Sequence, residues 1–465
     1  MKVQKATGDS YGLYFALLNL SAILNVLLDL GISNYNNRKI AAHPERFKNY
    51  FSSITVIRFS LAILFTIVIQ LVGALFGYSS DQLFLLFILG MNQVLLSSIL
   101  YIRSNYTALG QFKIDSFFSV FDRILMISGV GWLIYAAGAI TIEKFIWIQF
   151  FGYLITFLAS TLVLLLVGKA SLPHLNVRFS KVLIRKSAPY AMIVLLMSAY
   201  NYSDSIMIER LLSDGIKENA LYAQSFRILT ALNNYAYLFA VLLLPIFSRM
   251  LKRKEAVGKL LNLSGGLLIY GVSAFVIITI HYRMDILSAC YGDYGLNNNF
   301  FSGEILLNKE NIIHSQKIYT VLILGIIPMS FNYCYGVLIT ASGKMGILNK
   351  IATVSLLLNL ILNVMLIPKY GAYGAAYASL ITQSFSAIAQ LLIAYKTFKI
   401  SFELLKPTRF LLGLSFLYFA IDNLDYLLSL QLRLLVIGVL TILGLLISVK
   451  FTGFLGLIRG LKKSN

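Results

Sequence analysis

The sequence predicts an all-α integral membrane protein with about thirteen transmembrane helices, each near the ~20 residues needed to cross a bilayer. Composition is the first reason: 58% of the 465 residues are hydrophobic and 12% are charged, whereas soluble domains carry roughly 25% charged residues. The second reason is that long apolar segments carry almost no charge inside. Such segments favour helices, because a helix satisfies its own backbone hydrogen bonds in lipid. The third reason is that basic residues collect in alternate connections.

The expected helices follow one another along most of the chain. One large water-soluble core is excluded, because a chain of this length could not bury so large an apolar fraction. Seven prolines are too few for a loop-rich protein. The expected segments are 11–32, 52–77, 82–104, 117–138, 143–168, 189–211, 219–248, 257–282, 317–341, 346–367, 372–395, 408–427 and 431–449.

The net charge of +20 reflects topology, and we expect no nucleic-acid partner. Every second connection is basic, which predicts that these connections and the C-terminus are cytoplasmic. The basic connections are 33–51, 105–116, 169–188 and 249–259, those holding Lys344 and Lys396, and the tail from Lys450. This topology puts the start of the sequence outside. Because residues 1–10 hold no signal peptide, we expect one further helix upstream of this sequence.

Nothing in the sequence predicts catalysis, a metal site or a cofactor. Cys290 and Cys334 show neither metal-ligand spacing nor a disulfide framework. No Gly-rich phosphate loop or nucleophile elbow is found. The four histidines lie at or near helix ends or in loops, which disfavours a buried histidine proton relay.

Two long stretches of the chain, 107–155 and 340–389, resemble each other. Both open with Thr-Ala-x-Gly, run one helix, turn through a short Gly-containing connection and return. Both start on the same predicted side, so the repeat is parallel and predicts two pseudo-symmetric helical bundles around a central cavity. The expected division is 1–170 for the N-terminal bundle, 171–188 for a cytoplasmic linker, 189–396 for the C-terminal bundle, and 397–465 for two additional helices and a basic cytoplasmic tail.

The stretch 8–41 holds Tyr-Gly-Leu at 11–13, Asp-Leu-Gly at 29–31 and then Arg38. This pattern resembles the second helix of the polysaccharide-exporter branch of the MOP superfamily. The first helix of that family has no counterpart here, which agrees with the topology predicted from charge. The likeness continues, in the order of the family's seventh, eighth and tenth helices, at Pro189, Asp204, Tyr222, Arg227, Pro245, Ser248, Pro328 and the turn 341–344.

The resemblance implies a Wzx-like flippase, which is a transporter and not an enzyme. Such proteins move undecaprenyl-diphosphate-linked oligosaccharide repeat units of O-antigen, capsule or exopolysaccharide across the bacterial cytoplasmic membrane by alternating access. The implied partners are the lipid-linked oligosaccharide, the bilayer, H+ or Na+ as coupling ion, and the polysaccharide polymerase machinery. The implied location is the inner membrane, with a multi-pass chain and a cytoplasmic C-terminus.

Five charged residues fall inside expected helices and are the first candidates for a transport path: Arg58, Asp122, Arg123, Asp204 and Arg227. A charge at the centre of a transmembrane helix costs at least about 2.5–3.5 kcal/mol, so it normally faces protein or water. Asp204 and Arg227 are expected at similar depth on adjacent helices. They predict either a structural ion pair or a cationic cavity that binds a diphosphate, and the two alternatives are compatible.

The remaining candidates have two interpretations each. Arg58 either extends to lipid headgroups or lies on the substrate path. Asp122 and Arg123 project about 100° apart on one helix, so at least one faces the bundle interior; we expect Arg123 on the substrate path. Asp122 and Asp204 are the candidates for ion coupling. Asn201 shares a face with Asp204, and Asn233 shares a helix with Arg227; these amides bind either sugar hydroxyls or a neighbouring helix.

Three other functions fit parts of the pattern. A multidrug exporter of the same superfamily would need an acidic cavity, whereas the five intramembrane charges comprise three Arg and two Asp. An exporter of another lipid-linked precursor, such as lipid II, would suit a cationic cavity equally well. A polymerase or ligase for lipid-linked sugars would carry a large outer loop, and the 283–316 connection is short for that role.

Overall fold

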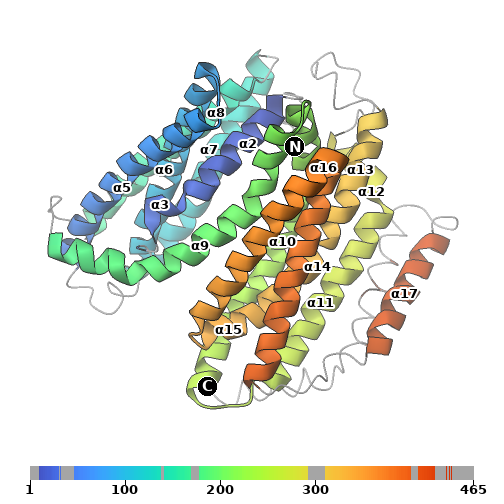
Figure 1. Ribbon diagram of the computed structural model, residues 1–465. Helices are drawn as coiled ribbons and strands as arrows, with labels where there is room; N and C mark the ends of the chain where they lie inside the picture. The colour runs from blue at the N-terminus through green and yellow to red at the C-terminus, as the bar shows by residue number, and fades with distance from the viewer. Residues whose placement is uncertain are drawn as a thin grey trace. The chain divides into compact units, whose positions relative to one another are not determined.

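The computed structural model describes residues 10–30, 32, 47–137, 141–168, 177–291, 309–398 and 407–424, together with residues 436, 439 and 441. These residues form helices joined by turns and bends, and no strand occurs among them (Figure 1). The predicted all-α class is therefore confirmed. The chain divides into two compact units, Met1–Ala220 with Leu296–Leu306, and Leu221–Gly295 with Leu307–Asn465.

The first unit is built mainly from long helices that pack side by side. Helix α6 packs on α8 and on α5, α7 packs on α8, and α2 packs on α9. The main segment of this unit ends at Ala220, within α10, and the rest of that helix belongs to the second unit. These helices are α2 (Ser10–Leu24), α3 (Val26–Asp29), α5 (Phe47–Leu75), α6 (Ser80–Ala108), α7 (Phe112–Ala137), α8 (Ile142–Gly168), α9 (Val177–Leu211) and α10 (Gly215–Lys252).

The second unit contains two irregular helices besides its regular ones. Within α16 the chain turns at Gly371 (φ 61°, ψ −145°), so this long element is two helices. Pro368 precedes that turn, and a proline removes a helical hydrogen bond, while glycine accepts the left-handed φ. The helices are α11 (Gly258–His281), α12 (Arg283–Tyr291), α13 (Lys309–Leu324), α14 (Ile326–Phe331), the π-helix η2 (Asn332–Gly336), α15 (Val337–Ala341), α16 (Met345–Phe398) and α17 (Pro407–Leu424).

The helices occupy the expected segments. Within the described part of the chain, nine helical segments are long and apolar enough to cross a membrane. Every expected segment from 11–32 to 408–427 coincides with a helix, with 317–341 formed by α13, α14, η2 and α15 together and with the two halves of α16 counted separately. The expected segment 431–449 lies almost wholly outside the described residues.

The domain boundaries expected from the repeat stay predictions. Two observations bear on that region. Helix α9 begins at Val177, so the second part of the expected 171–188 linker is helical. Helix α9 also packs on α2 and lies within the first unit, whereas the repeat assigned residues from 189 onward to the C-terminal bundle.

Apolar side chains cover the outer faces of the helices. Large exposed residues on α7 include Ile127, Trp132 and Tyr135. Contiguous apolar surface of this kind is rare on soluble monomers but matches the hydrocarbon core of a bilayer. The interior, by contrast, buries polar groups, among them Asn92, Asn359, Asn363 and Gln383. The chain is thus a multi-pass membrane protein whose polar residues are turned inward.

Candidate functional site

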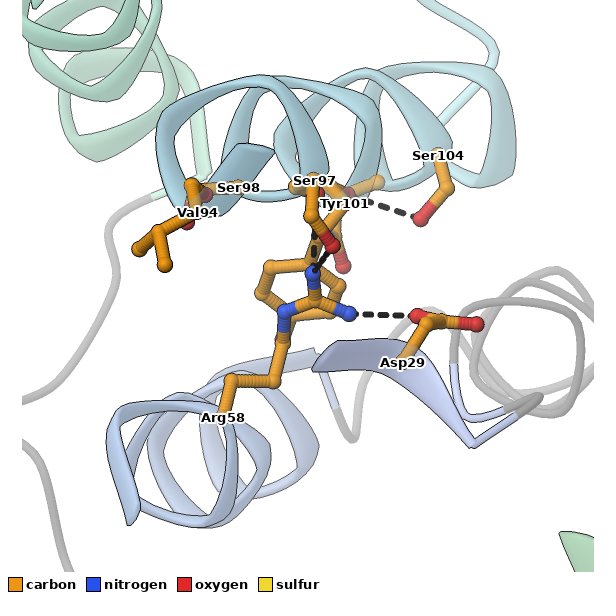
Figure 2. Close-up of polar contacts among 8 residues, drawn as sticks. Asp29, Arg58, Val94, Ser97, Ser98, Tyr101 and Ser104 are labelled. Atoms are coloured by element: carbon orange, nitrogen blue, oxygen red, sulfur yellow. Dashed lines mark hydrogen bonds and ion pairs between the residues drawn. The ribbon is translucent and has the colours of Figure 1, made fainter. Parts of the chain in front are cut away.

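Arg58 lies at the centre of the strongest polar cluster of the first unit (Figure 2). Its side chain is 8% exposed. Nη1 donates to the carboxylate of Asp29, and Nη2 donates to the Ser97 backbone carbonyl at 2.8 Å and to the Ser97 hydroxyl at 2.6 Å. The guanidinium carbon lies 4.8 Å from the ring centroid of Tyr101. The cation is therefore paired, hydrogen-bonded and stacked on one aromatic ring.

The sequence builds this cluster from three helices. Asp29 is the last residue of α3, and Leu30 ends the helix in the left-handed region (φ 46°). The guanidinium of Arg58 supplies the positive partner of this carboxylate. Ser97 and Tyr101 lie four residues apart on α6 and share one face. One turn earlier on both partners, Asn25 donates to the Gln93 side chain at 3.2 Å.

This geometry tests one of the two interpretations of Arg58, extension to lipid headgroups; its place on the substrate path stays a prediction. A snorkelling arginine would be exposed at the headgroup level, whereas Arg58 is buried and paired within the first unit. The snorkelling interpretation is therefore wrong: the carboxylate of Asp29 and the carbonyl of Ser97 supply inside the protein the partners that lipid headgroups would otherwise supply.

The two neighbouring charges of α7 separate as their spacing requires. Asp122 is 6% exposed, whereas the Arg123 side chain is 68% exposed and lies 3.4 Å from Asp122. Arg123 shares the exposed face of Val120 and Ile127. The residue that faces the packed side is thus Asp122, because the long arginine stem of Arg123 can lie along apolar surface and keep its charge outside. That Arg123 lies on the substrate path stays a prediction.

Asp204 lies in a polar part of α9. It is 2% exposed, and its neighbours Ser203 and Ser205 are buried as well. Asn201, one turn earlier, is half-buried. Asp204 belongs to the first unit and Arg227 to the second, so their pairing stays a prediction.

Two hydrogen bonds that the sequence did not predict join the start of α10 to α9 and α2 within the first unit. The Ser205 hydroxyl donates to the Asn219 carboxamide at 2.9 Å, and the Asn219 amide donates to the backbone carbonyl of Gly12 at 2.7 Å. The helices approach so closely that a Cβ on Gly12 would lie 1.8 Å from the Ile216 carbonyl oxygen. Glycine is therefore required at the Tyr-Gly-Leu motif.

A second cluster missed by sequence reasoning joins the α5–α6 turn to the end of α9. The Tyr78 hydroxyl donates to the Glu209 carboxylate at 3.1 Å, and Arg210 pairs with the same carboxylate at 2.8 Å. The Arg210 guanidinium carbon lies 3.7 Å from the Tyr78 ring centroid. Burial raises the pKa of Tyr78 to about 12, so this hydroxyl stays a donor at neutral pH.

Arg227 is half-buried on α10 in the second unit. One turn earlier, Gln224 ties this helix to its neighbours, because its side-chain oxygen accepts from the Ser315 hydroxyl at 3.0 Å. The Gln224 backbone carbonyl accepts from the Tyr291 hydroxyl at 3.3 Å. These bonds join the part of α10 that carries Arg227 to α12 and α13.

Asn233 contacts a neighbouring helical segment. The Tyr333 hydroxyl donates to its side-chain oxygen at 2.8 Å, and Tyr333 belongs to the π-helix η2. In the same segment, Asn332 donates to Gln383 at 3.4 Å. The helix-contact interpretation of Asn233 is therefore realised. Sequence reasoning overlooked Tyr333 and Gln383; the available signal was a polar side chain within an expected transmembrane segment.

A family model described as polysaccharide biosynthesis protein matches residues 7–251, more than half of the 465 residues. The chain belongs to this family. The resemblance that the motifs at 8–41 suggested is therefore confirmed. No curated protein sequence matches the chain.

Solved structures confirm the fold of this polysaccharide biosynthesis protein. The structure titled "Lipid II flippase MurJ, inward closed conformation" shares 17% identity and a TM-score of 0.69, and covers 97% of this chain and 98% of that one. An inward-facing multidrug resistance MATE family transporter of the MOP superfamily shares 12% identity and a TM-score of 0.63, and covers 85% and 93%. A MOP superfamily transporter from Pyrococcus furiosus shares 14% identity and a TM-score of 0.54, and covers 85% and 88%.

Proposed function

We propose that this protein is a flippase that moves undecaprenyl-diphosphate-linked oligosaccharide repeat units across the bacterial cytoplasmic membrane by alternating access. The observation that carries the proposal is the match of residues 7–251 to the polysaccharide biosynthesis protein family. The fold supports it, because a flippase for a lipid-linked precursor aligns with nearly the whole chain. The C-terminus would lie in the cytoplasm, as the alternation of basic connections predicts.

The cargo carries a diphosphate, so its path needs cations. Arginine presents a planar fork that binds phosphate oxygens well. Arg227 is our first candidate because it is half-buried on a transmembrane helix. Arg58 is the weaker candidate, because Asp29 and Ser97 already occupy its guanidinium. Arg123 is a candidate if the exposed face of α7, on which it lies, borders the substrate path.

The sugar and the coupling ion need other groups. Asn201 and Asn233 are the candidates for hydrogen bonds to sugar hydroxyls, with Tyr333 beside Asn233. Asp122 and Asp204 are the candidates for H+ or Na+ coupling, because both carboxylates are buried within helices.

The test is the location of lipid-linked oligosaccharide in the host after deletion of the gene. We expect complete repeat units to accumulate on the cytoplasmic leaflet and surface polysaccharide to be lost. The intact gene and the Arg253→Gln variant should restore export, since Arg253 is 65% exposed in the α10–α11 turn. Arg227→Gln should reduce export at least about tenfold, because the substitution removes one charge-assisted contact to the cargo.

Two outcomes would contradict the proposal. Normal surface polysaccharide without accumulation after deletion would exclude this cargo. Full export by Arg227→Gln, at an expression level equal to that of the intact protein, would remove Arg227 from the path.

A second candidate cargo is a lipid II-like precursor, favoured by the alignment with a lipid II flippase. Mass spectrometry of the accumulating lipid separates the two. A peptidoglycan precursor on the inner leaflet, with intact surface polysaccharide, would support this candidate instead.

A further inference from the structure

The second unit contains a cavity of about 380 Å³ that none of the transport candidates lines. We call it the outer pocket. Its walls come from the start of α12, from α13 and from the turn inside α16, and α13 contacts both of the other helices (Figure 1). The lining residues are Arg283, Ile313, Gln316, Lys317, Thr320 and Tyr373.

Two cations of the outer pocket lack acidic partners. Within the described residues neither Arg283 nor Lys317 forms an ion pair. Arg283 is held in place by a hydrogen bond from Nη1 to the Ile280 carbonyl at 2.8 Å, which leaves its other N–H groups available. Asp285, two residues later on α12, is exposed and does not line the cavity. The pocket is therefore positively charged.

The uncharged residues that line the outer pocket add hydrogen-bonding groups for a ligand. The Gln316 side-chain nitrogen is buried and has no hydrogen-bond partner in the described part of the chain. A buried donor without an acceptor is unfavourable, and a ligand oxygen would supply the missing acceptor. The Tyr373 hydroxyl lies 2.9 Å from that of Tyr377, and the two rings are 4.7 Å apart. Aromatic edges of this kind suit a sugar or glycerol group next to an anion.

The location of these cations runs against the charge pattern of the chain. Helix α11 begins next to the basic 249–259 connection and ends at His281, so Arg283 lies at the opposite, predicted outer, face. The turn at Gly371 that precedes Tyr373 is at the same predicted face. The membrane segment that includes α13 begins at Ile313, so Lys317 is close to the level of lipid headgroups. Outer connections normally carry few basic residues.

We propose that the outer pocket binds the phosphate group of a lipid at the outer face of the membrane. Arg283 would grip two phosphate oxygens with its planar fork, and Lys317 would act as a point charge. Gln316 would donate to a further oxygen. Two lipids present this chemistry: an anionic phospholipid, and a polyprenyl diphosphate that carries sugar. Phosphate binding here does not rest on the proposed function, because it needs no transport.

The first experiment measures binding of inorganic pyrophosphate to the purified full-length protein in nanodiscs of uncharged lipid, by titration calorimetry. We expect saturable binding by the intact protein. The double variant Arg283→Gln/Lys317→Gln should bind at least about tenfold more weakly, since each lost contact to a charged group is worth tenfold or more. The matched control Arg253→Gln, in the predicted cytoplasmic turn, should bind as the intact protein does.

A variant that retains both charges shows whether a loss of binding comes from misfolding or from the removed charge. Arg283→Lys/Lys317→Arg should bind within a few fold of the intact protein, because charge is kept even though fork geometry is altered. Equal affinity of the intact and doubly neutralised proteins would overturn the proposal. Loss of binding in Arg253→Gln as well would also overturn it, because the effect would then follow net charge and not this pocket.

Competition identifies the source of the phosphate. Nanodiscs that contain phosphatidylglycerol should abolish pyrophosphate binding if the ligand is a phospholipid headgroup. Undecaprenyl diphosphate in the same nanodiscs should do so if the ligand is a polyprenyl diphosphate. Either result supports the pocket, and failure of both lipids to displace pyrophosphate overturns it. Export in the deletion strain is measured separately. A failure of the flippase proposal can therefore be told apart from a failure of phosphate binding at the outer pocket.

Discussion

The two compact units hold their buried polar groups by different means. In the first unit an ion pair joins the buried guanidinium of Arg58, which also contacts α6, to the carboxylate of Asp29, whose side chain is 30% exposed. In the second unit the network around the π-helix is neutral and consists of amides and hydroxyls: Tyr333 with Asn233, Asn332 with Gln383, and Gln390 with Ser386. Removal of a neutral hydrogen-bond partner costs about 1–3 kcal/mol, whereas an uncompensated buried charge costs more. Loss of one partner of the Arg58–Asp29 pair should therefore cost more stability than loss of one partner in the neutral network.

The π-helix strengthens this contrast. π-helical turns interrupt the regular hydrogen-bond ladder and occur often at functional sites. Here the turn Asn332–Gly336 places two side chains against α10 and α16. It also brings Gly336 within reach of Gln390, where an added Cβ would lie 2.1 Å from the carboxamide oxygen. Irregular backbone and exchangeable neutral hydrogen bonds permit rearrangement at lower cost than a buried ion pair.

The largest effect is expected in the first unit. Asp29→Ala should lower the free energy of unfolding by about 3–5 kcal/mol, because it leaves the guanidinium of Arg58 buried without its carboxylate. Asp29→Ala/Arg58→Met should recover part of that loss. The measurement is detergent-denaturant unfolding of both variants and the intact protein. A double variant less stable than Asp29→Ala would show that the pair is not the source of the effect.

Two glycine substitutions compare the units directly. Gly12→Ala should cost about 1–3 kcal/mol or more, because its methyl group meets the Ile216 backbone carbonyl. Gly336→Ala should cost less, about 1–2 kcal/mol, since the Gln390 side chain can move after breaking its 3.0 Å bond to Ser386. Gly346→Ala is the control, with open space around its Cβ. Melting temperatures in detergent report the order, and equal shifts at Gly12 and Gly336 would refute it.

A smaller loss is expected for the neutral network. Tyr333→Phe removes the hydroxyl that donates to Asn233 and should cost about 0.6–1.7 kcal/mol, the range for hydrogen bonds between transmembrane helices. Unfolding in detergent measures the loss. A cost near that of Asp29→Ala would erase the proposed difference between the units.

The smallest effect is expected at Arg123. Arg123→Gln should change stability by less than about 0.5 kcal/mol, because the side chain is 68% exposed and exposed ion pairs contribute little. Asp122→Asn, at the buried partner, serves as the comparison. A stability loss above 1 kcal/mol for Arg123→Gln would place this cation in a packed environment after all.

The membrane architecture and the set of candidate charges followed from the order of the amino acids alone. Helix positions followed from hydropathy because in lipid each helix must satisfy its backbone locally, whatever its neighbours. The cost of charge inside a membrane helix made Arg58, Asp122 and Asp204 candidates for polar contacts, and all three are buried. The motifs at 8–41 were sufficient to indicate the family that the 7–251 match confirms.

Which polar groups contact one another depends on how the helices pack. The sequence motif placed Asp29 at the end of a helix. Its pairing with Arg58 depends on how α3 and α5 pack. The choice between Asp122 and Arg123 depended on which face of α7 meets α8. The outer pocket joins segments from Arg283 to Tyr373, and its first part had been assigned to a loop. Hydropathy records the depth of a residue, whereas the identity of its partner depends on helix rotation and packing, which are non-local.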